Sequence, residues 1–193
     1  MKCIAHRGYS LKYRDNSIEA IREAIHREYD GVEIDVQLCE TGELILFHDV
    51  YIKGKFISEM NLSQLKEMGI ITLQQVYEEI PEIRRTLLIL DIKGADLNVT
   101  RALEKFYENE STENVFFCSF NRKIVYRLPK EFKIGSTFET TFHKSEYPLI
   151  TMALDAVILH WTCLDHDFIS HCRSHGIKVY TYTHKEDEEL EYM

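Results

Sequence analysis

The chain has 193 residues, of which 45% are hydrophobic, and this is enough for one globular domain (1–193) with an ample core. Its formal net charge is −9, and no cluster of Lys or Arg is longer than a pair, which argues against nucleic acid as a partner. No apolar run approaches the ~18 residues of a membrane span, so none is expected.

The cysteines and the N-terminus indicate a cytoplasmic protein. The five cysteines are an odd number without CxxC spacing, so we interpret them as reduced thiols and not as a disulfide framework or a zinc site. The N-terminal MKCIAHRG reaches charged residues too early for a signal peptide.

Short β-branched or aromatic runs alternate with amphipathic stretches, a pattern typical of βα units and a parallel sheet. Seven parallel strands are expected at 3–5, 32–36, 86–93, 115–120, 134–138, 156–161 and 179–183. Helices are expected at 17–28, 62–68, 73–80, 99–109, 123–128, 147–153 and 165–174, and a further helix is expected to run from the seventh strand to Met193.

The apolar run 44–47 follows the second strand after a turn signal at 40–43. A parallel neighbour would need a crossover of a dozen or more residues, and only a short turn is available here. We therefore predict an antiparallel hairpin arm, followed by a small hairpin at 52–57.

The second strand carries two carboxylates, Glu33 and Asp35, on one face, because side chains on a strand repeat every second residue. Its other face is apolar. Such a pair is costly to bury unless a cation or a basic partner neutralises it. The hairpin arm ends in His48 and Asp49, and we expect it to bring an imidazole back beside the two acids.

Polar side chains recur at or near the carboxyl ends of the predicted strands, where parallel sheets carry their chemistry. They are His6, Arg7, Glu33, Asp35, Asp91, Lys93, Ser119, His160 and Thr183.

Several motifs resemble those of the glycerophosphodiester phosphodiesterases. HRG follows the first strand, EID lies on the second, FHD closes the hairpin, and an acid-Ile-Lys run lies on the third. Residues 15–20, DNSIEA, resemble the family's ENTLEAF segment, TLQQV resembles its TLEEV helix, and YTYT resembles its WTVN strand. The match covers nearly the whole chain, and it implies a TIM (β/α)8-type barrel.

The chain departs from the family pattern at two places. Asp91 stands where the third strand usually carries Glu, which resembles the related spider-venom phospholipase D. The family's eighth strand, usually GVDGIxTD, does not occur in residues 1–193, so the barrel is expected to be short by its last strand. Either a shorter barrel-like sheet closes by itself, or these residues are a fragment of a longer barrel. The open edge offers unpaired backbone groups through which a homo-oligomer can form.

Glu33, Asp35 and Asp91 are the candidate metal ligands. Three carboxylates, together with waters and a substrate phosphate, suit Mg²⁺ or Ca²⁺, which both prefer oxygen. The alternative is a salt-bridged trio that faces solvent. We favour the metal site, because the acids recur at the carboxyl ends of separate strands.

His6 and His48 are the candidate acid and base. The resemblance implies that one histidine accepts a proton from an attacking substrate hydroxyl and that the other protonates the leaving oxygen. It also implies that the reaction passes through a cyclic phosphate. Either histidine alone is more often structural, but as a pair beside the acids they favour catalysis.

The remaining candidates bind substrate or support the site. Arg7 and Lys93 are predicted to hold phosphate oxygens, although both can instead serve as counter-ions to the acids. Asp49 is predicted to hydrogen-bond the site, and Trp161 and Tyr180 to wall the pocket, although large aromatics at strand ends are as often plain packing. Asn16 and Glu19 are interpreted as supports.

The predicted function is metal-dependent hydrolysis of small-molecule glycerophosphodiesters to glycerol phosphate and an alcohol. One alternative is lysophospholipase D-type activity, which would need an apolar groove for an acyl chain. Another is a degenerate barrel that binds a phosphorylated ligand without turnover.

Overall fold

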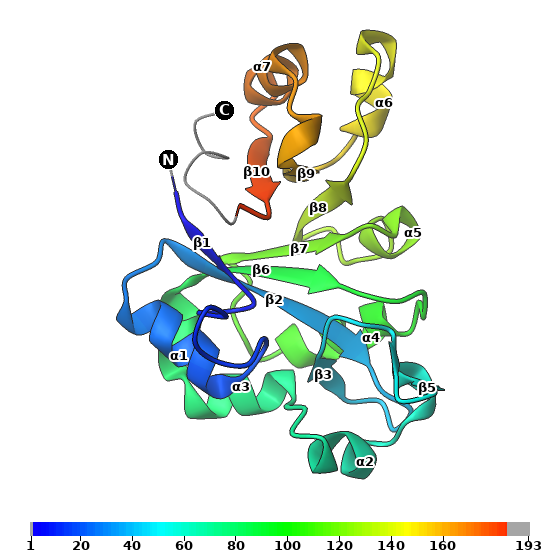
Figure 1. Ribbon diagram of the computed structural model, residues 1–193. Coiled ribbons are helices and arrows are strands. Elements are labelled where there is room, and N and C mark those ends of the chain that lie inside the picture. The colour runs from blue at the N-terminus through cyan, green and yellow to red at the C-terminus, as the bar shows by residue number, and fades with distance from the viewer. Residues whose placement is uncertain (1, 185–193) are drawn as a thin grey trace.

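A curled parallel sheet is the centre of the computed structural model, which describes residues 2–184 (Figure 1). Its strands follow the order β1-β2-β6-β7-β8-β9-β10, and all neighbouring pairs along this path are parallel. The bounds are β1 Ile4–His6, β2 Gly31–Leu38, β6 Leu87–Ile92, β7 Val115–Ser119, β8 Lys133–Phe138, β9 Ala156–His160 and β10 Lys178–Tyr182. The seven predicted parallel strands are thus confirmed.

Helices connect the successive strands. The α-helices are α1 Ile18–His26, α2 Leu62–Glu67, α3 Leu73–Glu79, α4 Val99–Tyr107, α5 Arg122–Val125, α6 Tyr147–Ile150 and α7 His166–Ser174. Short 3₁₀ turns are η1 Ile57–Glu59, η2 Pro81–Arg85, η3 Lys144–Glu146 and η4 Trp161–Cys163. Both α5 and α6 are shorter than expected, and the helix expected after the seventh strand lies outside the described residues.

The segment after β2 forms the predicted antiparallel arm. Strand β3 (Leu44–Leu46) pairs with β2 in antiparallel register. A separate two-stranded hairpin follows, with β4 at Tyr51–Ile52 and β5 at Lys55–Phe56. This long excursion between β2 and β6 carries His48, so its placement decides where that imidazole lies.

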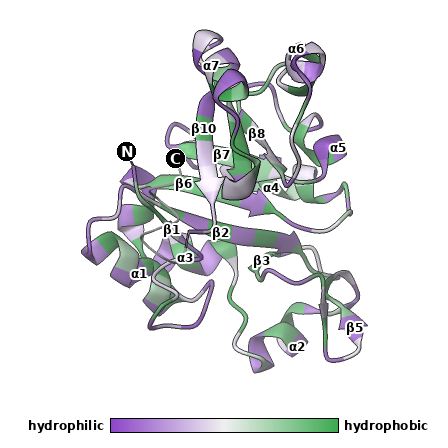
Figure 2. Cartoon of the chain, turned by 45° about the horizontal axis from the view of Figure 1, so that its top comes forward, coloured by the Kyte–Doolittle hydropathy of each residue, from purple (hydrophilic) through white to green (hydrophobic). Residues whose placement is uncertain are grey.

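The two faces of the sheet have different neighbours. The outward side chains of β2 and β6, such as Ile34 and Leu90, pack with α1, α3 and α4 into the largest apolar cluster. The inward face holds a smaller cluster that includes Ile89, Phe116 and Ile158. Figure 2 shows the mixed character of β2, whose ribbon alternates between hydrophobic and hydrophilic colours. Polar groups on the inward face of β2 are therefore enclosed by the curled sheet.

Side-chain caps fix where the helices beside the site begin. The Ser17 hydroxyl accepts a hydrogen bond from the backbone N–H of Ala20 at the start of α1. At the start of α3, Thr72 and Gln75 form a reciprocal capping box. Such caps satisfy backbone donors that the first helical turn leaves unpaired.

A close backbone approach ties the β1–α1 connection to α1. Gly8 has φ +78°, and a Cβ built there would lie 2.6 Å from the carbonyl carbon of Ala20. The next residue, Tyr9, donates its N–H to the Ala20 carbonyl at 2.8 Å. Only glycine fits this contact, and it fixes the turn that carries His6 and Arg7.

Within residues 2–184, β1 and β10 each pair with one strand and form the two edges of the sheet. Self-association through an open edge of the sheet remains a prediction. All five cysteines are free thiols, as expected. Among the described residues, no helix has the length and apolar character needed to cross a membrane.

The contact at Gly8 predicts a larger loss of stability for Gly8→Ala than for Gly176→Ala. Gly176 has a similar φ of +72°, but a Cβ there would meet nothing within 4 Å. Gly176→Ala should cost about 1 kcal/mol of unfolding free energy, from φ alone. Gly8→Ala should cost roughly 3 kcal/mol, because a backbone clash is added. Urea unfolding of both variants measures the difference. Equal losses would show that the close approach adds nothing.

Candidate active site

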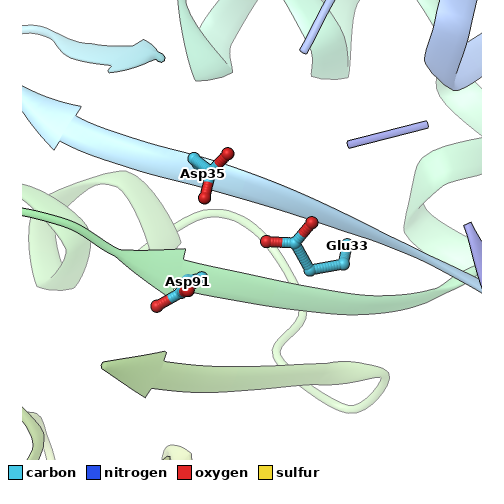
Figure 3. Close-up of side chains that lie close together, drawn as sticks. All are labelled: Glu33, Asp35 and Asp91. Carbon is cyan, nitrogen blue, oxygen red and sulfur yellow. The ribbon is translucent and has the colours of Figure 1, made fainter. Parts of the chain in front are cut away.

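Three carboxylates meet on the inward face of two neighbouring strands (Figure 3). Glu33 and Asp35 lie on β2, and Asp91 lies on β6 directly opposite Asp35 in the parallel register. One oxygen from each of the three lies within 4.8 Å of the others. The predicted candidate ligands are thus brought together in a group that could hold a metal ion.

Burial makes this cluster electrostatically costly. Asp35 is 1% exposed and Asp91 is 8% exposed. Burial, reinforced by the negative charges of Asp35 and Asp91, raises the pKa of Glu33 well above its ordinary value. Burial also raises the pKa of Asp91, against the opposing charge of Lys93. The three acids therefore need positive charge from neighbouring groups.

Lys93 and Arg7 supply part of the compensation. Lys93 Nζ lies 2.6 Å from Asp91 Oδ2 and 3.1 Å from Asp35 Oδ1. Burial alone would lower the pKa of Lys93, but the charges of Asp91 and Asp35 overcome this and raise it. Arg7 Nε lies 3.2 Å from Asp35 Oδ2, and the Arg7 backbone N–H donates to Glu33 Oε2 at 2.9 Å. Both basic residues thus act as internal counter-ions at the place predicted for phosphate contacts.

The remaining oxygens fit a divalent cation. Asp91 Oδ1 is buried and has no hydrogen-bond partner, and Asp35 Oδ1 has only the ionic contact with Lys93. A buried carboxylate oxygen without a partner is expensive. An all-oxygen donor set with an unpaired buried oxygen is what Mg²⁺ or Ca²⁺ prefers, so the residues fit the predicted kind of ion.

His6 is the last residue of β1 and lies beside the acids. It pairs with Glu33 in the parallel register, and its Nε2 lies 3.8 Å from Glu33 Oε2. Burial and the positive charge of Arg7 lower the pKa of His6 to about 4, although Asp35 and Asp15 oppose this. The imidazole is therefore neutral near pH 7 and can accept a proton.

His48 lies on the loop after β3, where a polar residue of β2 holds it. Gln37 Nε2 donates to the carbonyls of Phe47 and Asp49 at 2.6 and 2.9 Å, so one amide fixes both neighbours of His48. Asp49 Oδ1 lies 2.7 Å from His48 Nδ1. A positive charge on the His48 imidazole would lower the pKa of Asp91. Gln37 is not among the residues predicted from the sequence, although the period-2 pattern of β2 puts it on the same face as Glu33 and Asp35.

Asn16 fixes the position of Asp35. Its Nδ2 donates to Asp35 Oδ2 at 2.9 Å, and its Oδ1 accepts from the Asp35 N–H at 3.0 Å. Asn16 is buried and has φ +57°, a conformation that Asn tolerates better than most residues. Glu19, the other expected support, lies exposed on α1.

The predicted wall residues come from β10 and η4. Tyr180 lies half-buried on β10, with its ring 5.9 Å from that of Phe116 inside the sheet. Trp161 stacks on His160 at a centroid distance of 5.9 Å. Another ring, Phe120, lies with its centroid 5.6 Å from Lys93 Nζ and is 47% exposed.

Comparison with known proteins assigns the chain to a family. Residues 6–193 match the model of the Glycerophosphoryl diester phosphodiesterase family, which covers nearly the whole chain. The chain therefore belongs to this family of phosphodiesterases, and the resemblance seen in its motifs is confirmed.

Two relatives illustrate the range of sequence similarity. A glycerophosphodiester phosphodiesterase of Caldanaerobacter subterraneus is 25% identical over 220 residues, which cover 98% of this chain and 88% of the relative. One of Bacillus altitudinis is 44% identical over 113 residues, which cover 49% of this chain and 46% of the relative.

Solved structures confirm the predicted fold class. The glycerophosphodiester phosphodiesterase of Thermotoga maritima superposes with a TM-score of 0.83 at 23% identity, covering 99% of this chain and 89% of its own. An Oleispira antarctica phosphodiesterase in complex with the product sn-glycerol-3-phosphate gives 0.86 at 22% identity, with coverages of 99% and 88%. The curled seven-stranded sheet thus follows the barrel architecture of these enzymes.

The contacts of Asn16 predict a specific loss of stability. Asn16→Gly keeps the positive φ accessible but removes both hydrogen bonds to Asp35, and should lower the unfolding free energy by about 2 kcal/mol. Glu28→Gly is the matched control, because Glu28 has φ +58° and is exposed at the end of α1. It should change stability by less than ~1 kcal/mol. Urea unfolding measures both, and similar values for the two would exclude a holding role for Asn16.

Proposed function

We propose that this family member is a divalent-metal-dependent phosphodiesterase that cleaves glycerophosphodiesters to glycerol phosphate and an alcohol. The observation that carries the proposal is the group of three carboxylate oxygens within 4.8 Å, with the His6 imidazole 3.8 Å from one of the acids. The Oleispira relative, in complex with sn-glycerol-3-phosphate, supports the choice of substrate.

Glu33, Asp35 and Asp91 would hold the cation, which we propose to be Mg²⁺ or Ca²⁺. When bound, such an ion offsets the charge of the phosphate and stabilises charge that develops on its oxygens. A cation is needed because the positive charges of Lys93 and Arg7 compensate the three acids only in part. An anionic substrate would otherwise meet a net negative site.

Arg7 and Lys93 would bind the phosphate. Both lie against the acids, and Lys93 has three donors of which the contacts to Asp91 and Asp35 use two. The Arg7 guanidinium also contacts Asp15 at 3.0 Å, which fixes its orientation. A guanidinium fork and an ammonium group are complementary to phosphate oxygens. Trp161 and Tyr180 would line the part of the site that holds the alcohol of the substrate.

His6 and His48 would move the protons. His6 is neutral near pH 7, so it is in the protonation state that can accept the proton of the attacking hydroxyl. His48 is oriented through Nδ1 by Asp49, which leaves Nε2 available to give a proton to the leaving oxygen. Gln37 and Asp49 act as positioning residues for this imidazole.

The direct test is the release of glycerol phosphate from glycerophosphocholine with Mg²⁺ or Ca²⁺, before and after addition of a chelator. We expect turnover that the chelator abolishes and that added metal restores. Release of lysophosphatidate from lysophosphatidylcholine, with no glycerophosphocholine turnover, would instead favour the lysophospholipase D alternative. Binding of glycerol phosphate without turnover of either substrate would indicate a non-catalytic barrel.

The proton-transfer roles predict that His6→Ala and His48→Ala each lower kcat by roughly 10²- to 10⁴-fold, because general acid or base catalysis is lost. His26→Ala is the matched control, since His26 is exposed on the last turn of α1. Its kcat should be unchanged. Circular dichroism would show whether the variants fold. A folded His6→Ala or His48→Ala variant with the wild-type rate would remove that histidine from the mechanism.

A further inference from the structure

An aromatic wall extends from the site to a carboxylate that the proposed reaction does not use. The wall, defined here as Phe120 and Tyr182, begins at Lys93, whose Nζ lies 5.6 Å from the Phe120 ring centroid. The centroids of Phe120 and Tyr182 are 6.2 Å apart, and their planes meet at 89°. At the far end, the Tyr182 hydroxyl donates to Glu139 Oε1 at 3.0 Å. The wall thus connects the phosphate end of the site to Glu139.

The curl of the sheet brings this wall together from three strands. Phe120 follows β7, Tyr182 ends β10, and Glu139 follows β8. The Tyr182 hydroxyl also contacts the Phe138 carbonyl at 3.3 Å, so Tyr182 spans the sheet interior from β10 to β8. Burial and the hydrogen bond to Glu139, with a contribution from the charge of Asp91, raise the pKa of Tyr182. Its hydroxyl therefore stays protonated and keeps donating to Glu139.

Glu139 is not neutralised by the part of the chain that the structure describes. Its side chain receives a hydrogen bond from Tyr182, and no ion pair joins it to a basic side chain in residues 2–184. It is exposed directly after the last residue of β8. A carboxylate that contacts one aromatic side chain, with a second ring next to it, is a combination that attracts a cation, because ring faces carry negative potential.

The series of contacts from Lys93 through the two rings to Glu139 indicates which kind of cation the wall could bind. Lys93 marks the phosphate end, and the wall leads from it past two rings to Glu139. An amino alcohol esterified to phosphate carries its nitrogen two carbons beyond the ester oxygen, so its positive charge would extend along the wall. A neutral alcohol such as glycerol offers no charge for Glu139 to attract.

We propose that Glu139, held by the Tyr182 hydroxyl, is a specificity determinant that favours phosphodiesters whose alcohol carries an ammonium group. The rings of Phe120 and Tyr182 contact the ammonium, and Glu139 provides the opposite charge. Both primary and quaternary ammonium groups satisfy this chemistry, since attraction to a ring face and to a carboxylate needs charge and not a particular hydrogen bond. The phosphodiesterase function proposed above is the basis for this assignment.

The test compares steady-state kinetics on three substrates: glycerophosphocholine, glycerophosphoethanolamine and glycerophosphoglycerol, whose alcohol is neutral. Glu139→Gln should lower kcat/KM about fivefold for the two ammonium substrates and leave glycerophosphoglycerol unchanged. The loss should be in KM, because Glu139 contacts neither the phosphate nor the acids. Tyr182→Phe keeps the ring but frees Glu139, and should give a smaller loss of the same pattern.

Glu131→Gln is the matched control, because Glu131 is exposed shortly before the first residue of β8 and its replacement removes the same charge. All three substrates should be turned over by this control at the wild-type rate. Equal losses of kcat/KM on charged and neutral substrates in Glu139→Gln would overturn the specificity role and place the glycerol moiety at the wall. An unchanged ratio of kcat/KM between the ammonium substrates and glycerophosphoglycerol in Glu139→Gln would overturn the specificity role as well. By contrast, a wild-type protein that turns over none of the three substrates would contradict the proposed function itself.

Discussion

The mutual repulsion of three enclosed carboxylates is the constraint on which the rest of this structure depends. Glu33, Asp35 and Asp91 lie on the inward face of a curled sheet where little of them reaches water, and burial raises the pKa of Glu33 and of Asp91. An apolar set of the same volume would stabilise the fold at least as well, so the acids are retained at a cost. Lys93 and Arg7 offset part of that cost. The proposed divalent cation and the substrate phosphate would complete the charge balance that Lys93 and Arg7 begin.

The surrounding structure holds the acids in place through a few long-range hydrogen bonds. Asn16, from the segment before α1, satisfies both the backbone and the side chain of Asp35. Gln37, one pleat beyond Asp35 on β2, fixes the loop that carries His48. Gly8 allows the β1–α1 turn to rest directly on α1. Strand β2 therefore carries two of the candidate metal ligands and, through Gln37, also holds the loop on which His48 lies.

The sequence predicted the site where local periodicity determines geometry. The alternation in residues 32–36 places Glu33 and Asp35 on one face of β2. Asp91 lies beside Asp35 because residues near the carboxyl ends of neighbouring parallel strands lie side by side in the sheet. The sequence did not predict the bond from Gln37 to the His48 loop, because it depends on how that loop folds back over β2. Phe120, Tyr182 and Glu139 likewise lie far apart in the chain, and only the curl of the sheet brings them together. Contacts between distant strands that are not neighbours leave no periodic signal.

The central claim is that Glu33, Asp35 and Asp91 share one divalent cation, and anomalous diffraction from a crystal soaked in Mn²⁺ tests it most directly. Mn²⁺ prefers oxygen ligands as Mg²⁺ does and scatters anomalously. We expect one strong anomalous peak within about 2.0–2.6 Å of oxygens from all three side chains, and its loss in crystals of Asp91→Asn. A peak elsewhere, or ordered carboxylates with no peak between them at millimolar Mn²⁺, would contradict the account.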